Sequence, residues 1–167
     1  MRPWHKRSIE EANLLNPAFL SIIIQRVIIA YSDSTQKNAP YVLPFLATSI
    51  VLHKPTRDAL PMRIDSTFAT WVTQLKGSHA MIGYPERTRS IVPYVKEALT
   101  FSLINNMIIA DGDGSFRVKQ QISVPTIPND TMTDEVVMCF KKAHFCGRWL
   151  AKAGKIETVM ALLGVKP

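Results

Sequence analysis

The most apolar segment of the chain follows Asn16 and predicts a helix that runs to about Tyr31. Asn16 is a favoured N-cap residue, and Pro17 suits the first helical position because the amide hydrogen that it lacks would stay unpaired there. Apolar side chains cover more than half of the helix circumference, whereas a surface helix carries a single apolar stripe. We therefore expect this segment to be the central core helix.

A second apolar run, Tyr41–Leu52, lies between Pro40 and Pro55. The β-branched pair Ile50 and Val51 favours a strand. However, the run shows no alternation between apolar and polar positions, and its length is that of a helix rather than a strand. It therefore predicts a second buried helix.

Two further helical segments are separated by polar residues. The first, Thr67–Leu75, is predicted to be capped by Asp65–Ser66 and closed by Gly77. The second begins at Pro85. Because proline disfavours helical geometry in the residue before it, Pro93 predicts a short helix followed by a separate or kinked one.

A β-hairpin is predicted directly after the more regular of these helices, Tyr94–Asn106. Its extended runs, Ile108–Ala110 and Phe116–Val118, are joined by the strong turn signal Asp111–Gly114. A helix followed at once by a hairpin is the order found in winged-helix domains. This order predicts a winged-helix-like part at about residues 85–120.

The C-terminal region begins with a predicted extended linker, because residues 120–130 contain two prolines. A helix is expected from Asp134 to Ala153, followed by a shorter one at Lys155–Leu163 that ends at Gly164. The C-terminal helices thus span about residues 134–164.

The length of 167 residues, with 47% apolar and 20% charged side chains, is that of one folded domain. The expected fold is mostly α with a small β-hairpin. A basic N-terminal segment occupies residues 1–15, and a single helical domain occupies residues 16–167. The formal charge of +7 favours an acidic partner, such as nucleic acid or an acidic protein face.

Neither a secretion signal nor a membrane span is expected. Residues 1–7 are positively charged, but Ser8–Glu11 is acidic where the apolar part of a signal peptide should follow. The apolar stretches at residues 22–29 and 41–52 are too short to cross a bilayer. We therefore expect a cytoplasmic protein without membrane contact.

Motifs for catalysis or metal binding are missing from the sequence. There is no glycine-rich phosphate loop, and a calcium loop starting at Asp111 would need a glutamate where Ile122 stands. Cys139 and Cys146 share a helix face that excludes His144, which argues against zinc, and they lie about 10 Å apart along the axis, too far for a disulfide. We expect no catalytic residue, metal or cofactor, and rank a metal-dependent hydrolase last.

Two basic groups have two interpretations each. His53, Lys54 and Arg57 follow an apolar helix and lie in an expected proline-containing loop. They act either as a C-terminal cap or as a site that docks an anion or a protein. Arg87 and Arg89, with Lys96, form either a solvated face or a second docking group.

The last long helix is predicted to be basic on one face, with Lys141, Arg148 and Lys152 in one stripe. Phe145 and Trp149 fall beside this stripe and not on the apolar face. Each is either covered by another segment, for which the final helix is the candidate, or offered to a partner.

Several short motifs occur together in the chain: Asn16-Pro17-Ala18-Phe19, His53-Lys54-Pro55-Thr56-Arg57, Val92-Pro93-Tyr94, Gly147-Arg148-Trp149 and Leu163-Gly164-Val165-Lys166-Pro167. From about Asn16 to Pro167 the chain resembles the middle component of bacterial three-component ABC systems.

The resemblance implies a non-enzymatic adaptor that is encoded with an ABC-type ATPase, related to chromosome-maintenance and repair proteins, and with an effector, often a nuclease. Such systems are thought to act in defence against phage. ATP hydrolysis and cutting would then belong to the partner subunits, and DNA would be reached through the complex. The expected partner contacts are His53, Lys54, Arg57, Arg87, Arg89, Tyr94, Phe145, Arg148 and Trp149.

The alternative is a free-standing winged-helix regulator that places Tyr94–Asn106 in the major groove. Arg117 and Lys119 would lie beside the DNA backbone, and Lys141 and Lys152 are further candidate DNA contacts. A regulator binds duplex DNA alone, with a steep salt dependence, whereas an adaptor needs its partners.

Overall fold

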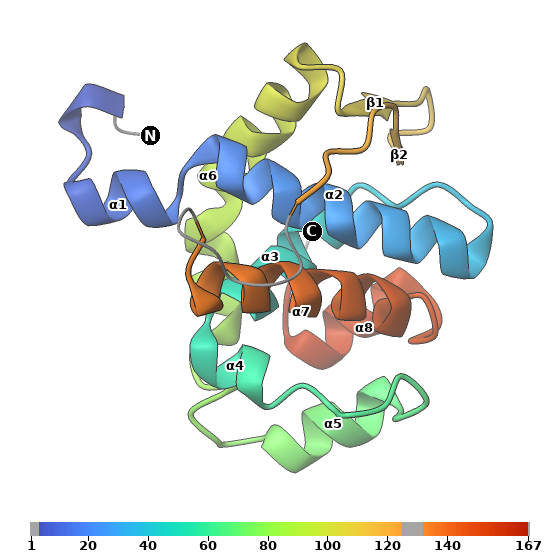
Figure 1. Ribbon diagram of the computed structural model, residues 1–167. Helices are drawn as coiled ribbons and strands as arrows, with labels where there is room; N and C mark the ends of the chain where they lie inside the picture. The colour runs from blue at the N-terminus through green and yellow to red at the C-terminus, as the bar shows by residue number, and fades with distance from the viewer. Residues whose placement is uncertain (1–3, 125–131, 167) are drawn as a thin grey trace.

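The most apolar helix of the chain, α2 (Pro17–Thr35), is surrounded by other helices in the computed structural model (Figure 1). The structure describes residues 4–124 and 132–166. Helices α7 (Asp134–Leu150), α6 (Tyr84–Ile104) and α3 (Leu43–Leu52) pack against α2. The predictions of a mostly helical protein and of a central core helix are confirmed.

The N-terminal end of α2 forms as predicted. The side-chain oxygen of Asn16 accepts a hydrogen bond from the Ala18 amide at 2.9 Å, and Pro17 occupies the first turn. At the other end the helix continues past Tyr31 to Thr35. It stops there because Gln36 adopts left-handed backbone geometry, with a φ of 55°.

The contact between α2 and α7 depends on Gly147. A Cβ atom built on Gly147 would lie 2.3 Å from the carbonyl oxygen of Val27 and 2.8 Å from the Cβ of Ala30. Backbones approach this closely only where a residue without a side chain stands between them. Gly147 therefore sets the distance between the two helices.

The segment after α3 differs from its prediction. The proline-containing stretch Lys54–Asp58, expected as a loop, forms a short helix, α4. Its proline sits in the first turn, where a missing amide hydrogen costs nothing. Helix α5 (Phe68–Leu75) is capped by Thr67, whose hydroxyl accepts from the Thr70 amide, so the predicted cap at Asp65–Ser66 is wrong.

Helix α6 is continuous through Pro93, so of the two predicted alternatives, a separate or a kinked second helix, the separate one is wrong. One buried stripe, which includes Tyr84, Ile91, Val95 and Leu99, runs through both halves of the helix. Packing of this stripe against α2 and α3 outweighs the single backbone hydrogen bond that Pro93 cannot make.

The predicted hairpin is confirmed as the antiparallel pair β1 (Ile108–Ala110) and β2 (Phe116–Val118). Phe116 is buried and pairs through its backbone with Ala39, which anchors the hairpin beside the C-terminal end of α2. The helix and hairpin expected of a winged-helix part are present, and the winged-helix assignment itself stays a prediction.

The buried side chain of Gln25 fixes the start of the predicted linker against α2. Its amide nitrogen donates to the carbonyl oxygens of Met107 and Gln120, and its amide oxygen accepts from the Ile122 amide at 2.8 Å. Residues 125–131, the greater part of that linker, lie outside the described residues.

The two C-terminal helices form nearly as predicted. α7 ends at Leu150, three residues before the predicted Ala153. α8 (Ile156–Leu163) ends at Gly164, which adopts the left-handed conformation with a φ of 69°.

The predicted basic N-terminal segment contains two short helices, η1 (Trp4–Lys6) and α1 (Ile9–Leu14). Ser8 caps α1, since its hydroxyl accepts from the Glu11 amide at 3.1 Å. No residue of α1 is buried. α1 is therefore an arm on the surface of the helical bundle (Figure 1).

Among the described residues, the segment Ile9–Thr35 is long and apolar enough to cross a membrane by length and composition alone. It includes α2, which is the core helix of this fold. The expectation that the chain has no membrane contact stays a prediction.

Candidate functional site

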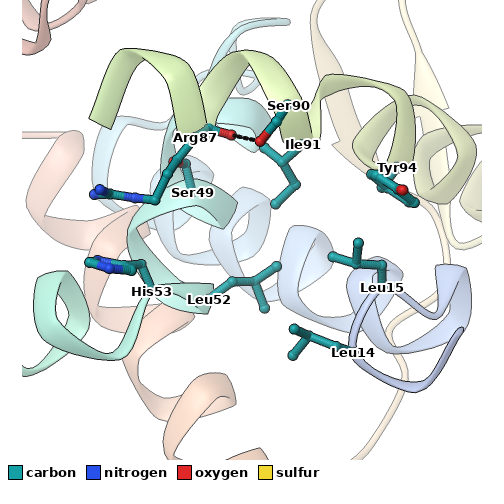
Figure 2. Close-up of a pocket in the computed structure, with 9 residues that line it drawn as sticks. All are labelled: Leu14, Leu15, Ser49, Leu52, His53, Arg87, Ser90, Ile91 and Tyr94. Carbon is teal, nitrogen blue, oxygen red and sulfur yellow. Dashed lines mark hydrogen bonds between the residues drawn. The ribbon is translucent and has the colours of Figure 1, made fainter. Parts of the chain in front are cut away.

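A cavity of about 430 Å³ lies between the arm helix α1 and the helices α3 and α6 (Figure 2). It brings together His53, Arg87 and Tyr94, three residues that the sequence predicted as partner contacts in separate segments. His53 and Arg87 lie at one end of the cavity and Tyr94 at the other. The remaining lining residues are Leu14, Leu15, Ser49, Leu52, Ser90 and Ile91.

The hydroxyl of Thr56 organises the end that carries His53 and Arg87. It donates its proton to the carbonyl oxygen of Ala80. It also lies 2.7 Å from Nδ1 of His53 and 3.2 Å from Nη2 of Arg87. Because the hydroxyl proton is already used, Nδ1 of His53 must donate, and neutral His53 therefore carries its lone pair on Nε2.

Burial and nearby positive charges favour the neutral form of His53. Burial is the larger cause, and the positive charges of Arg87 and Arg57 add to it, so the pKa of His53 falls below its usual 6.5. Burial also lowers the pKa of Arg87, whose guanidinium lies 5.6 Å from the ring centre of Tyr84 and donates to the carbonyl oxygens of Ile82 and Ala80.

At the other end, Tyr94 holds the arm. Its hydroxyl donates to a carboxylate oxygen of Glu11 at 2.6 Å. The guanidinium of Arg7 lies 5.5 Å from the Tyr94 ring centre and forms an ion pair with Glu97 at 2.9 Å. These polar contacts fasten α1 over the apolar middle of the cavity.

A second cavity, of about 460 Å³, shares Leu14 and Leu52 with the first. Its other lining residues are Glu10, Asn13, Asn16, Phe19, Arg57, Glu135, Val136 and Cys139. The two cavities together form a groove beneath α1, which we call the arm groove. Two of the predicted basic groups, around His53 and around Arg87, therefore contribute to one surface feature.

Arg57, predicted as a partner contact, is only 1% exposed. Its Nη1 donates to the carbonyl oxygen of Val51 at 2.7 Å and lies 3.3 Å from Sγ of Cys139, and its Nη2 forms an ion pair with Glu135. The bond to Val51 satisfies a carbonyl at the C-terminal end of α3. The interpretation of Arg57 as a helix cap thus holds, and the same side chain joins α3, α4 and α7.

Trp149, also predicted as a partner contact, is 1% exposed and is covered by α5. Its indole nitrogen donates to the carbonyl oxygen of Ser66 at 2.7 Å, and its ring lies 5.0 Å from those of Phe68 and Trp71. The alternative in which another segment covers Trp149 therefore holds, with α5 as the cover where the final helix was the candidate. The apolar face of α5 was the available sign of this contact.

The other predicted contacts lie at or near the surface. Lys54 is exposed and forms an ion pair with Asp58 at 2.7 Å, Arg89 and Arg148 are exposed, and the half-buried ring of Phe145 lies 5.8 Å from the Lys142 ammonium. The candidate DNA contacts Arg117, Lys119, Lys141 and Lys152 are exposed too. Arg117 pairs with Asp111, and Lys119 donates to the side chain of Asn106.

The cysteines are buried and free. Burial raises the pKa of Cys146 to about 12 and raises that of Cys139 as well. Within residues 4–124 and 132–166, no three His, Cys, Asp or Glu side chains are grouped in a way that could hold a metal ion.

The sequence reasoning missed Glu11, Leu14 and Leu15, because it treated residues 1–15 only as a basic segment. A usable signal was present. Ser8 and Glu11 have the spacing of a helix-capping box, which marks the start of a helix rather than a tail.

Comparison with known families decides the relationship. The family model described as the ABC-three component system middle component 3 matches residues 4–167, which is nearly the whole chain. The chain belongs to the middle component 3 family. The resemblance found in the sequence is thereby confirmed, and the match includes the arm as well as the helical bundle. No curated protein and no solved structure is significantly similar to this middle component.

Proposed function

We propose that this chain is a non-catalytic adaptor that connects an ABC-type ATPase with an effector, often a nuclease. The observation that carries the proposal is the family match over residues 4–167, since a middle component implies other components of the same ABC system. ATP hydrolysis and effector chemistry then reside in the partners, and rearrangement of the ATPase reaches the effector through this chain.

The proposed setting is a cytoplasmic complex that defends bacteria against phage. The charge of +7 suits acidic surfaces, which belong either to the partner proteins or to DNA held by the complex. The helix and hairpin at residues 84–118 have the order of a winged-helix part. The surface that carries the hairpin is therefore the one proposed to contact DNA.

The arm groove is the proposed partner surface. His53, Arg87 and Tyr94 all line it, and the exposed residues Lys54 and Ser90 lie on helices that border it. A concave apolar surface with a few convergent polar groups is the usual form of a binding site.

A pull-down of the tagged full-length chain with the products of its neighbouring genes tests the proposal. Trp149 and Arg57 are unsuitable for substitution because both are buried. The variant carries Lys54→Glu with Ser90→Glu at the groove, and the matched control carries Lys76→Glu with Thr73→Glu, which are exposed residues at the end of α5.

The proposal predicts that the unaltered chain and the control recover an ATPase or an effector and that the groove variant loses at least one of them. Recovery of DNA with no protein partner would contradict it and would favour the winged-helix regulator. Equal recovery by both variants would place the contact elsewhere and remove the arm groove from the proposal.

A further inference from the structure

Arg57 has an incompletely bonded guanidinium in the arm groove. Its Nη1 contacts Val51 and Cys139, and its Nη2 pairs with Glu135. Its Nε is buried and has no hydrogen-bond partner among the described residues. A buried donor on a charged group is costly when it stays unpaired, so this nitrogen calls for an acceptor.

The geometry of the guanidinium indicates which kind of acceptor fits this nitrogen. Nε and Nη2 form one side of the planar guanidinium, and a carboxylate fits that side with two parallel hydrogen bonds. Glu135 reaches only Nη2, and its side chain is 58% exposed. Glu135 can therefore turn into solvent and stay hydrated, and its departure leaves Nη2 as well as Nε without an acceptor.

The walls around this edge are mainly apolar. Phe19, Leu52 and Val136 line the same cavity as Arg57, and Leu14 separates it from the neighbouring cavity. A ligand that fills the arm groove thus needs apolar side chains as well as a carboxylate. The arm itself presents this combination to the cavity of Arg57, because Glu10 and Leu14 of α1 both line it.

We propose that the arm groove docks an acidic amphipathic segment of a partner protein, and that a carboxylate of this segment takes the Nε and Nη2 edge of Arg57 in place of Glu135. The identity of the partner rests on the proposed adaptor function, whereas the carboxylate site does not. A carboxylate that takes the place of Glu135 leaves the charge beside Arg57 unchanged, whereas the consecutive phosphates of a nucleic acid would add negative charges next to Glu10 and Glu135.

The first test follows the Nε–H resonance of Arg57 by NMR in the full-length chain, with acetate as the probe and chloride at equal ionic strength as the reference. Glu135→Gln removes the competing carboxylate. Asp134→Asn removes the neighbouring carboxylate in the same first turn of α7 and is the matched control.

Acetate should shift this resonance saturably, with a Kd about tenfold lower in Glu135→Gln than in the control, a factor that corresponds to about 1.4 kcal/mol. The unaltered chain should respond like the control, so the test remains even if Glu135→Gln fails to fold. A response to acetate no different from that to chloride, or a stronger response to inorganic phosphate, would overturn the proposal.

The second test measures binding of the ATPase or effector recovered in the pull-down. Glu135→Gln should bind it about tenfold more tightly than the unaltered chain, with Asp134→Asn unchanged. Equal affinity of all three forms would overturn the displacement of Glu135. If no partner is recovered by any form, the adaptor function fails while the acetate titration still decides the carboxylate site.

Discussion

At the residue scale, Gly147 is the position where the smallest change has the largest expected effect. Gly147→Ala places a methyl group 2.3 Å from the carbonyl oxygen of Val27, and the backbone of α2 cannot move away without disturbing the core. Overpacking of this kind should lower the free energy of unfolding by about 1–3 kcal/mol, despite the better helix propensity of alanine.

Chemical denaturation measures this loss. Gly112→Ala is the matched control, because nothing lies within 4 Å of a Cβ at Gly112. The control should stay within about 0.5 kcal/mol of the unaltered chain. Equal stability of the two alanine variants would show that α2 and α7 are not in close contact.

His53 gives the protein a dependence on pH. Because its pKa is lowered from 6.5 in the folded state, the unfolded state binds a proton more readily than the folded state as the pH falls below 6.5. The free energy of unfolding should therefore be largest above pH 6.5 and should decrease below it.

Urea denaturation between about pH 8 and pH 5 tests this prediction with His53→Gln. The variant should lose part of the decrease. It should not lose all of it, because burial also lowers the pKa of His144. A pH profile identical to that of the unaltered chain would show that His53 does not contribute to the pH dependence of stability.

Single residues were predictable where their role is local. The Asn16 cap and the Gly164 terminus depend on their own turn and were predicted correctly. Arg57 and Trp149 were placed at a surface, yet each is buried by an element distant in sequence: Glu135 lies 78 residues from Arg57, and Ser66 lies 83 residues from Trp149. Local pattern carries no information on such contacts.

At the scale of elements, α1 lies on the surface of the bundle. None of its residues is buried, and the hydrogen bond from Tyr94 to Glu11 links it to α6. Tyr94→Phe removes that bond, which should speed hydrogen exchange of the amides of residues 9–14 by about tenfold or more.

Hydrogen exchange followed by NMR or mass spectrometry measures the change. Tyr31→Phe is the control, since the Tyr31 hydroxyl has no hydrogen bond to the described residues. Exchange in α2 should stay the same in both variants. Unchanged exchange in residues 9–14 of Tyr94→Phe would mean that other contacts hold the arm.

The elements themselves were largely predictable, because most have an unambiguous apolar period. α6 is the exception. Pro93 is a strong local signal for a break, but the stripe from Tyr84 to Ser102 buries both halves against the same neighbours. Tertiary packing therefore decided what propensity alone could not.

At the scale of the whole molecule, the relation to a known family was accessible from the sequence, whereas the arm groove was not. The basic motif at His53–Arg57 and the segment Arg87–Tyr94 each suggested a docking site. Only the fold shows that they share one groove, that Arg57 lies inside it, and that residues 9–15 form its outer wall.

The central claim is that this chain connects two other subunits. The most direct measurement is the mass of the assembly by size-exclusion chromatography with light scattering, using the proposed ATPase and effector partners with and without this chain. We predict a single complex of all three that separates into ATPase and effector when the chain is left out. Association of the ATPase and effector without the chain, or elution of the chain apart from both, would contradict the claim.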